Sequence, residues 1–430
     1  MADKKSNWYP LFIIGTLFFV FGFITWLNGI LIPYFQICLD LNNFQSFLVV
    51  LASFSAYFIM ALPSAWVLKF TGYKKGISLG LFVMAAGTFL FLPAAYARAY
   101  PLFLTGLFIT GSGLALLQTA ANPYVAIIGP IESTAQRIGF MGLCNKIAGI
   151  ISITILGKIF LFKADDVIAK LNTSTIGEKS IILNNYILKV IEPYLVISCV
   201  LILLGILILF SKLPEVKEAE STNTGLENDS QTTKKILHYP YLVLGVLALF
   251  FSAACEGIPV DGIVIYSRMI GVKMALARHF ATFTLCAMLL GYLFTIIAIP
   301  KYISQQKTLK LSAILGLGLT AISIFSGGML SIYCIILMGF GSSMLWGTIW
   351  GLSLRNLGSY TKQGSALLLM SVIGGGIFPI IYGKLLDINP KYAISLLIPC
   401  YLGILFYSIY GYRIENWKTI NPFYKKPSIG

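Results

Sequence analysis

Three ionisable residues lie inside long apolar stretches of the chain: Lys146, Glu256 and Asp261. A charge in the middle of a bilayer costs about 2.5–3.5 kcal/mol even on the lenient insertion scale, so each of the three is a hypothesis for function. A carboxylate held away from water can load and release a proton, and two carboxylates together can instead bind sodium. The sequence therefore predicts a cation-coupling group and leaves proton and sodium as alternatives.

Glu256 and Asp261 are five residues apart, which places them about 140° apart on a regular helix. Pro259, with Gly257 and Gly262 on either side, predicts an unwound or kinked segment that turns both carboxylates towards one cavity. The alternative is structural, because Lys146 could form a buried ion pair with one of the two acids and only lock the helices together. The sequence does not decide which acid that would be.

Two amides and a proline interrupt another apolar stretch, at Gln118, Asn122 and Pro123. Amide side chains in hydrocarbon need a partner, and a proline inside a helix leaves a backbone carbonyl free, so this helix must border protein or water. We interpret it as one wall of a polar cavity. The alternative is that the amides only join neighbouring helices by hydrogen bonds.

Amides that read hydroxyl groups and aromatic faces that stack on apolar CH surfaces are the chemistry of sugar binding. The residues that could supply it lie in several apolar stretches, and Trp346 shares a helix face with Trp350, four residues on. For any single Trp, anchoring at the membrane interface is the alternative. The candidate substrate-binding residues are Trp26, Asn28, Gln118, Asn122, Asn145, Trp346 and Thr348.

The composition requires a membrane. The 430 residues are 57% hydrophobic and 11% charged, with a mean hydropathy of +0.85, and about 20 apolar residues are enough to span the hydrocarbon. We predict an all-α integral membrane protein with twelve transmembrane helices in two six-helix bundles. The predicted spans are 9–34, 44–68, 76–96, 101–125, 138–162, 188–211, 240–265, 274–299, 309–327, 329–352, 364–386 and 392–412.

The longest polar stretch between spans divides the chain into similar halves. The predicted organisation is an N-terminal bundle over 1–211, a cytoplasmic linker over 212–237, a C-terminal bundle over 238–413 and a cytoplasmic tail over 414–430. The halves share weak motifs, which pair span one with span seven, four with ten, and five with eleven. This pairing puts Asp261 at about the depth of Asn28 and Gly29, and Thr348 near that of Gln118.

The net charge of +15 does not indicate nucleic acid, because most Lys and Arg residues fall on one side of the predicted topology. That distribution follows the positive-inside rule with both termini cytoplasmic. The seven cysteines are scattered, which predicts neither disulfides nor metal ligands. The only histidines, His238 and His279, form no cluster with acids, so we predict no enzyme, no cofactor and no metal site.

Two motifs are the most specific: Leu117-Gln118-Thr119-Ala120-Ala121-Asn122-Pro123-Tyr124 and Met141-Gly142-Leu143-Cys144-Asn145-Lys146. Three others accompany them: Trp26-Leu27-Asn28-Gly29-Ile30-Leu31-Ile32-Pro33, Gly129-Pro130-Ile131-Glu132-Ser133 and Lys362-Gln363-Gly364-Ser365. Together they resemble the major facilitator superfamily and, within it, the fucose:proton symporter family, with motifs closest to its glucose/galactose and N-acetylglucosamine permeases. The resemblance covers all twelve spans.

This resemblance implies a secondary transporter that imports a hexose or amino-hexose by proton or sodium symport and alternating access. Fucose permeases look to have carboxylates where this chain has Gly29 and Gln118, and we hypothesise that coupling has moved to Asp261. The resemblance also implies a multi-pass protein of the bacterial inner membrane, working as a monomer. The alternatives are an uncoupled sugar facilitator, an L-fucose permease or a transport-dead sugar sensor.

Overall fold

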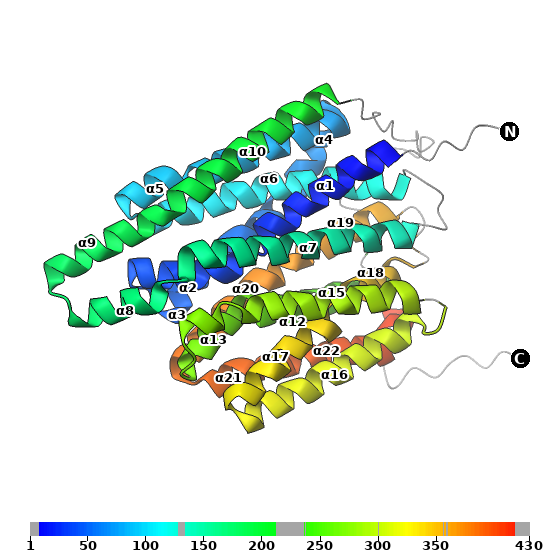
Figure 1. Ribbon diagram of the computed structural model, residues 1–430. Helices are drawn as coiled ribbons and strands as arrows, with labels where there is room; N and C mark the ends of the chain where they lie inside the picture. The colour runs from blue at the N-terminus through cyan, green and yellow to red at the C-terminus, as the bar shows by residue number, and fades with distance from the viewer. Residues whose placement is uncertain are drawn as a thin grey trace, which may run out of the picture.

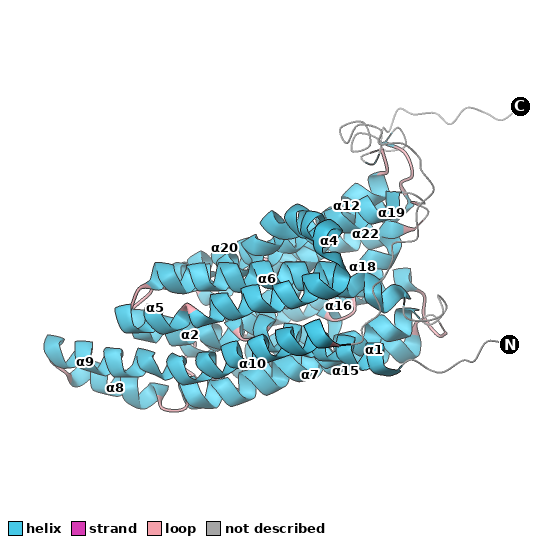
Figure 2. Ribbon diagram, turned by 90° about the horizontal axis from the view of Figure 1, so that it is seen from above, coloured by secondary structure: helices cyan, strands magenta, loops and turns pink. Residues whose placement is uncertain are grey.

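The computed structural model describes residues 8–127, 134–211, 236, 238–299, 301–355, 357 and 360–417. The side chains of residues 8–11, 122–127, 134–138, 361 and 362 lie outside this description. The predicted linker over 212–237, apart from Ile236, and the tail from residue 418 also lie outside it. Figure 2 shows helices throughout the described residues and no strand. The all-α prediction is confirmed.

Helices of the N-terminal half, residues 8–211, run in a regular up-and-down order (Figure 1). They are α1 (Trp8–Thr25), α2 (Asn28–Leu39), α3 (Asn43–Ser46), α4 (Leu48–Phe89), α5 (Phe91–Ala97), α6 (Tyr100–Ile127), α7 (Thr134–Leu161), α8 (Ala164–Thr173), α9 (Ile176–Ile187) and α10 (Ile191–Phe210).

Helices of the C-terminal half, residues 238–417, repeat this order. They are α12 (Pro240–Gly257), α13 (Ile263–Met269), α14 (Met274–Ala277), α15 (Phe280–Ala298), α16 (Gln305–Ser326), α17 (Gly328–Ser342), α18 (Leu345–Leu354), α19 (Thr361–Met370), α20 (Gly374–Ile388), α21 (Pro390–Ser395) and α22 (Leu397–Ile409). A π-helical segment, Ile258–Gly262, joins α12 to α13.

The described residues contain eleven helical runs that are long and apolar enough to cross a membrane. One of them, Asn43–Ala97, has 55 residues, which would extend about 80 Å at 1.5 Å per residue, far beyond a hydrocarbon core of about 30 Å. Gly72 inside α4 has φ 71°, in the left-handed region that favours glycine, and it reverses the chain there. This run is therefore two spans, and the twelve-helix prediction agrees with the structure.

Long helices from both halves lie side by side along the molecule (Figure 1). α7 packs against α1 within its own half and against α15 of the other half, while α4 packs against α20. The π-helical segment packs against α2. One end of the molecule carries α3, α8, α9, α14 and α21, and we call this the distal end; α1 begins at the opposite end.

Candidate functional site

A buried ion pair joins the two halves. Lys146, on α7, places its Nζ 2.7 Å from Oε1 of Glu256, in the last turn of α12. The Lys146 side chain is 4% exposed and that of Glu256 is 17% exposed. A buried ion pair is stable only when both partners stay, because losing one leaves an uncompensated charge away from water. The partner of Lys146, which the sequence left open, is Glu256.

Aromatic rings complete the surroundings of the Lys146 ammonium. Its Nζ lies 3.7 Å from the centroid of the Trp26 ring and 5.6 Å from that of Tyr292, on α15. The negative face of an aromatic ring attracts a cation, and the attraction is stronger where water is excluded. Gly149 allows the Trp26 indole to approach α7 this closely, because a Cβ on residue 149 would lie 2.6 Å from Cδ1 of the indole.

Trp26 connects this cluster to a predicted substrate residue. Its Nε1–H donates to Oδ1 of Asn145 at 3.0 Å. The same indole therefore holds Lys146 by its face and Asn145 by its edge. The structure brings Trp26, Asn145, Lys146 and Glu256 into one group, which we call the Lys146 cluster.

Asp261 lies in the π-helical segment, five residues after Glu256. Where the sequence predicted an unwound or kinked segment around Pro259, the structure has a π-helical segment. This is a local widening of the helix, a feature that is frequent at functional sites. The carboxylate is 3% exposed, and its Oδ1 has no hydrogen-bond partner among the described residues. It lies close enough to Lys146 and Glu256 for electrostatic interaction with both.

Asp261 faces Gly29 of the other half. A Cβ built on Gly29 would lie 3.4 Å from Oδ1 of Asp261 and 3.3 Å from the carbonyl oxygen of Val260. The comparison between the halves predicted a similar depth for the two residues, but not that they would be in contact. The structure thus places a buried carboxylate, whose Oδ1 has no partner in the described part of the chain, directly against the backbone of α2, where the absence of a side chain on Gly29 leaves room for it.

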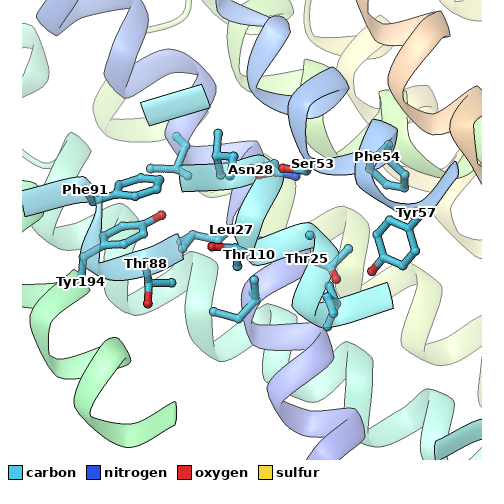
Figure 3. Close-up of a pocket in the computed structure, with 15 residues that line it drawn as sticks. Thr25, Leu27, Asn28, Ser53, Phe54, Tyr57, Thr88, Phe91, Thr110 and Tyr194 are labelled. Carbon is cyan, nitrogen blue, oxygen red and sulfur yellow. The ribbon is translucent and has the colours of Figure 1, made fainter. Parts of the chain in front are cut away.

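Asn28 and Gln118 are not part of the Lys146 cluster. Asn28 is 3% exposed and lines a cavity of about 30 Å³ between α2, α4, α6 and α10, together with Ser53, Thr88 and Thr110 (Figure 3). This space suffices for one or two water molecules and not for a sugar. Gln118 on α6 donates from Nε2 to the Tyr57 hydroxyl at 3.4 Å, a long hydrogen bond.

The aromatic pair of the C-terminal half has the predicted shared face. The rings of Trp346 and Trp350 on α18 are stacked, with centroids 5.6 Å apart and an interplanar angle of 21°. Thr348 is buried, and its hydroxyl bonds to the carbonyls of Met344 at 2.6 Å and Leu345 at 3.0 Å. The threonine hydroxyl is therefore engaged by its own helix in this conformation.

Some predicted residues lie outside what the structure describes. Asn122 belongs to α6, but its side chain is among those left out, as is that of Lys362. The motif Gly129–Ser133 also lies outside the described residues. Within the described ranges, His, Cys, Asp and Glu side chains form no group of three that could hold a metal ion.

Sequence reasoning missed Tyr57, Gly149 and Tyr292. Tyr57 and Tyr292 stand among many aromatic residues in apolar helices, and no spacing distinguishes them. Gly149 follows Lys146 by three residues, so it lies on the same helix face, and this was the one available signal that a bulky partner approaches there.

The comparisons with known proteins identify the family of this chain. Residues 14–379 match the family model of the Major Facilitator Superfamily. A glucose/galactose transporter of Brucella abortus is 32% identical over 95% of this chain and 96% of its own length. The L-fucose-proton symporter of Escherichia coli is 30% identical over 95% of this chain and 94% of its own length.

A crystal structure of a Major Facilitator Superfamily transporter, FucP, in the outward conformation superimposes with a TM-score of 0.74. It is 29% identical in sequence and covers 94% of this chain and 99% of its own. A D-xylose-proton symporter structure, at 13% identity and a TM-score of 0.69, shows the same fold. The chain is a multi-pass membrane transporter, not an enzyme, and it belongs to the Major Facilitator Superfamily.

Proposed function

We propose that this protein imports a neutral hexose or amino-hexose of the glucose/galactose class, together with a proton, by alternating access. The names of its relatives, which include glucose/galactose transporters and L-fucose-proton symporters, support the substrate class. The site supports the coupling, because a facilitator has no evident need for acids buried in the middle of its helices.

One observation carries the proposal: among the described residues, Asp261 is a buried carboxylate without a salt-bridge partner, whereas Glu256 is neutralised by Lys146. A carboxylate in such a place is stable only when it is protonated or when a cation comes to it. Asp261 is therefore the group whose charge changes during transport. Lys146 and Glu256 form a fixed pair that keeps the rest of the site neutral.

A proton fits this site better than sodium. Sodium needs several oxygen ligands, and the neighbouring acid, Glu256 in the last turn of α12, already binds Lys146. A proton needs only the free carboxylate of Asp261. Because Asp261 lies against Gly29 of the opposite half, its charge directly affects how closely α2 and the π-helical segment can approach.

On the sugar side, we propose that Asn145 links substrate to coupling. Its Oδ1 accepts from Trp26, so its amide nitrogen is the atom that offers hydrogens to a sugar hydroxyl. A sugar that displaces or reorients Trp26 would also alter the ring that covers Lys146. Gln118, Asn122, Asn28, Trp346 and Thr348 remain candidates for the walls of the cavity that opens between the halves.

We also propose the surroundings that the sequence predicts: a bacterial inner membrane, both termini cytoplasmic, and a monomer. The bundles over 1–211 and 238–413, joined by the linker over 212–237, are the two bodies that would rock against each other. Exposed apolar side chains on α10, including Val196, Val200, Leu203 and Leu207, support contact of this helix with lipid.

The proposal is tested by uptake into proteoliposomes of radiolabelled glucose, galactose, N-acetylglucosamine and fucose. Each sugar is measured with an imposed proton gradient, an imposed sodium gradient, or neither. We expect accumulation above equilibrium for glucose, galactose or N-acetylglucosamine under the proton gradient alone. Accumulation under sodium alone would contradict proton coupling, equilibration without accumulation would identify a facilitator, and preference for fucose would overturn the substrate class.

A further inference from the structure

Two aspartates at the distal end each bridge the halves by binding backbone N–H groups. Asp387, near the end of α20, accepts from the backbone N–H of Asn43 and of Phe44, both at 3.3 Å, and from Nδ2 of Asn43 at 2.7 Å. Asp165, in the first turn of α8, accepts from the backbone N–H of Met274 and of Ala275, both at 2.9 Å.

The two contacts are reciprocal. Asp387 belongs to the C-terminal half and binds the start of α3 in the N-terminal half, whereas Asp165 belongs to the N-terminal half and binds the start of α14 in the C-terminal half. α3 follows span one and α14 follows span seven. Asp165 follows span five and Asp387 ends span eleven. The repeat that pairs span one with span seven, and span five with span eleven, therefore also relates the Asp165 contact to the Asp387 contact.

Close packing surrounds the Asp387 contact. A Cβ on Gly383 of α20 would lie 2.9 Å from the carbonyl oxygen of Asn43 and 2.6 Å from the ring of Phe47, so α3 rests directly on α20. Gln36 donates from Nε2 to Oδ1 of Asn43 at 2.7 Å, which fixes the orientation of that amide towards Asp387.

Further cross-half contacts accompany Asp165. Arg278, just after α14, donates from Nη1 to the carbonyl oxygen of Gly157 on α7 at 3.4 Å, and its guanidinium lies 5.1 Å from the centroid of the Phe162 ring. Arg268, on α13, interacts electrostatically with Asp165. Both contact sites thus hold loops of one half against helix ends of the other.

We propose that Asp165 and Asp387 form a matched pair of clasps that keep the distal ends of the halves together and open as one unit during transport. Alternating access requires the halves to separate at each end in turn. A carboxylate on two backbone N–H groups is a charge-assisted contact that can break and re-form without rearranging either helix. Because both clasps span the same separation, neither can remain closed when the distal end opens.

The test is amide hydrogen exchange, measured by mass spectrometry on the purified full chain in nanodiscs. Asp387→Ala removes the acceptor of one clasp, and exchange is then read at the other, in peptides that cover residues 272–278. Asp165→Ala is read in peptides that cover residues 42–47. If the clasps are one unit, losing either should raise exchange at the distant one about tenfold, which corresponds to about 1.4 kcal/mol.

Asp166→Ala is the matched control, since Asp166 lies exposed on the same turn as Asp165; it should leave both peptides unchanged. Faster exchange only in the loop that lost its own acceptor would overturn the proposal and make the contacts local caps. If exchange rises throughout the chain, the alanine variant is unfolding. Asp387→Asn and Asp165→Asn, which retain one acceptor oxygen, are then measured instead. The proposal again requires faster exchange in the peptide that covers the other clasp. The outcome does not depend on which sugar or ion is carried.

Discussion

The last turn of α12 and the π-helical segment that follows it carry two acids in contrasting situations. Glu256 has a lysine 2.7 Å away, and an aromatic ring covers that lysine. Asp261 is more deeply buried than Glu256, yet its Oδ1 has no partner among the described residues. The contrast separates two roles that composition alone cannot distinguish: a paired acid holds the halves together, while an unpaired one is free to change its charge.

Of the substitutions that test this contrast, Asp261→Asn should have the largest effect on transport. Asparagine has nearly the same shape but cannot carry a charge, so we expect concentrative uptake to fall to simple equilibration, while counterflow of labelled sugar continues. Thermal stability should be retained or rise, because a buried unpaired acid is replaced by a neutral amide. Asp166→Asn, at an exposed position, should accumulate sugar like the wild type.

The next largest effect should come from breaking the ion pair. Lys146→Met leaves the Glu256 carboxylate buried without its cation, which costs about 3–5 kcal/mol. We expect a clear fall in the thermal denaturation midpoint of the detergent-purified protein. The double variant Lys146→Met with Glu256→Gln removes both charges and should recover most of the loss. A double variant as unstable as the single one would contradict the pair's role in holding the halves.

A smaller effect should come from Trp26→Phe. This change keeps an aromatic face over Lys146 but removes the N–H that binds Asn145, worth about 1 kcal/mol for a single hydrogen bond. We expect a several-fold weaker sugar affinity in equilibrium binding, with little change in stability. Trp66→Phe is the matched control, because Trp66 on α4 is exposed and belongs to no proposed site. An equal loss of affinity there would show that the indole hydrogen bond to Asn145 has no special part.

The smallest effect should come from Gly29→Ala. The added Cβ would lie 3.4 Å from Oδ1 of Asp261 and 3.3 Å from the carbonyl oxygen of Val260, so neighbouring atoms need to move by only a few tenths of an ångström. We expect about a twofold lower uptake rate. A complete loss of uptake would mean that α2 and the π-helical segment approach each other more closely during transport than they do in this structure.

The sequence predicted the helices well because each span depends on local composition, and the reversal at Gly72 depends on a glycine between basic residues. It also predicted that the helix departs from regular geometry around Pro259, although not that the departure is π-helical, and that Asp261 lies at about the depth of Gly29. It could not choose between Glu256 and Asp261 as the partner of Lys146, since that choice depends on where α7 lies relative to the end of α12 in three dimensions.

Contacts between residues that are distant in the chain were out of reach for the same reason. Trp26 and Asn145 are far apart in the chain, and nothing in their spacing indicates that the indole N–H would reach the amide. The clasps at Asp165 and Asp387 involve backbone N–H groups, which every residue type except proline offers. Their acids therefore look like ordinary loop residues until the repeat places both loops at one end of the fold.

The central claim is that protons enter with the sugar through Asp261. It is tested most directly by adding the transported sugar to lightly buffered proteoliposomes and recording the external pH with an electrode. The account predicts a sugar-dependent rise in external pH for the wild type and for Asp166→Asn, and none for Asp261→Asn even though labelled sugar still exchanges. A sugar-dependent pH rise that persists in Asp261→Asn would contradict it.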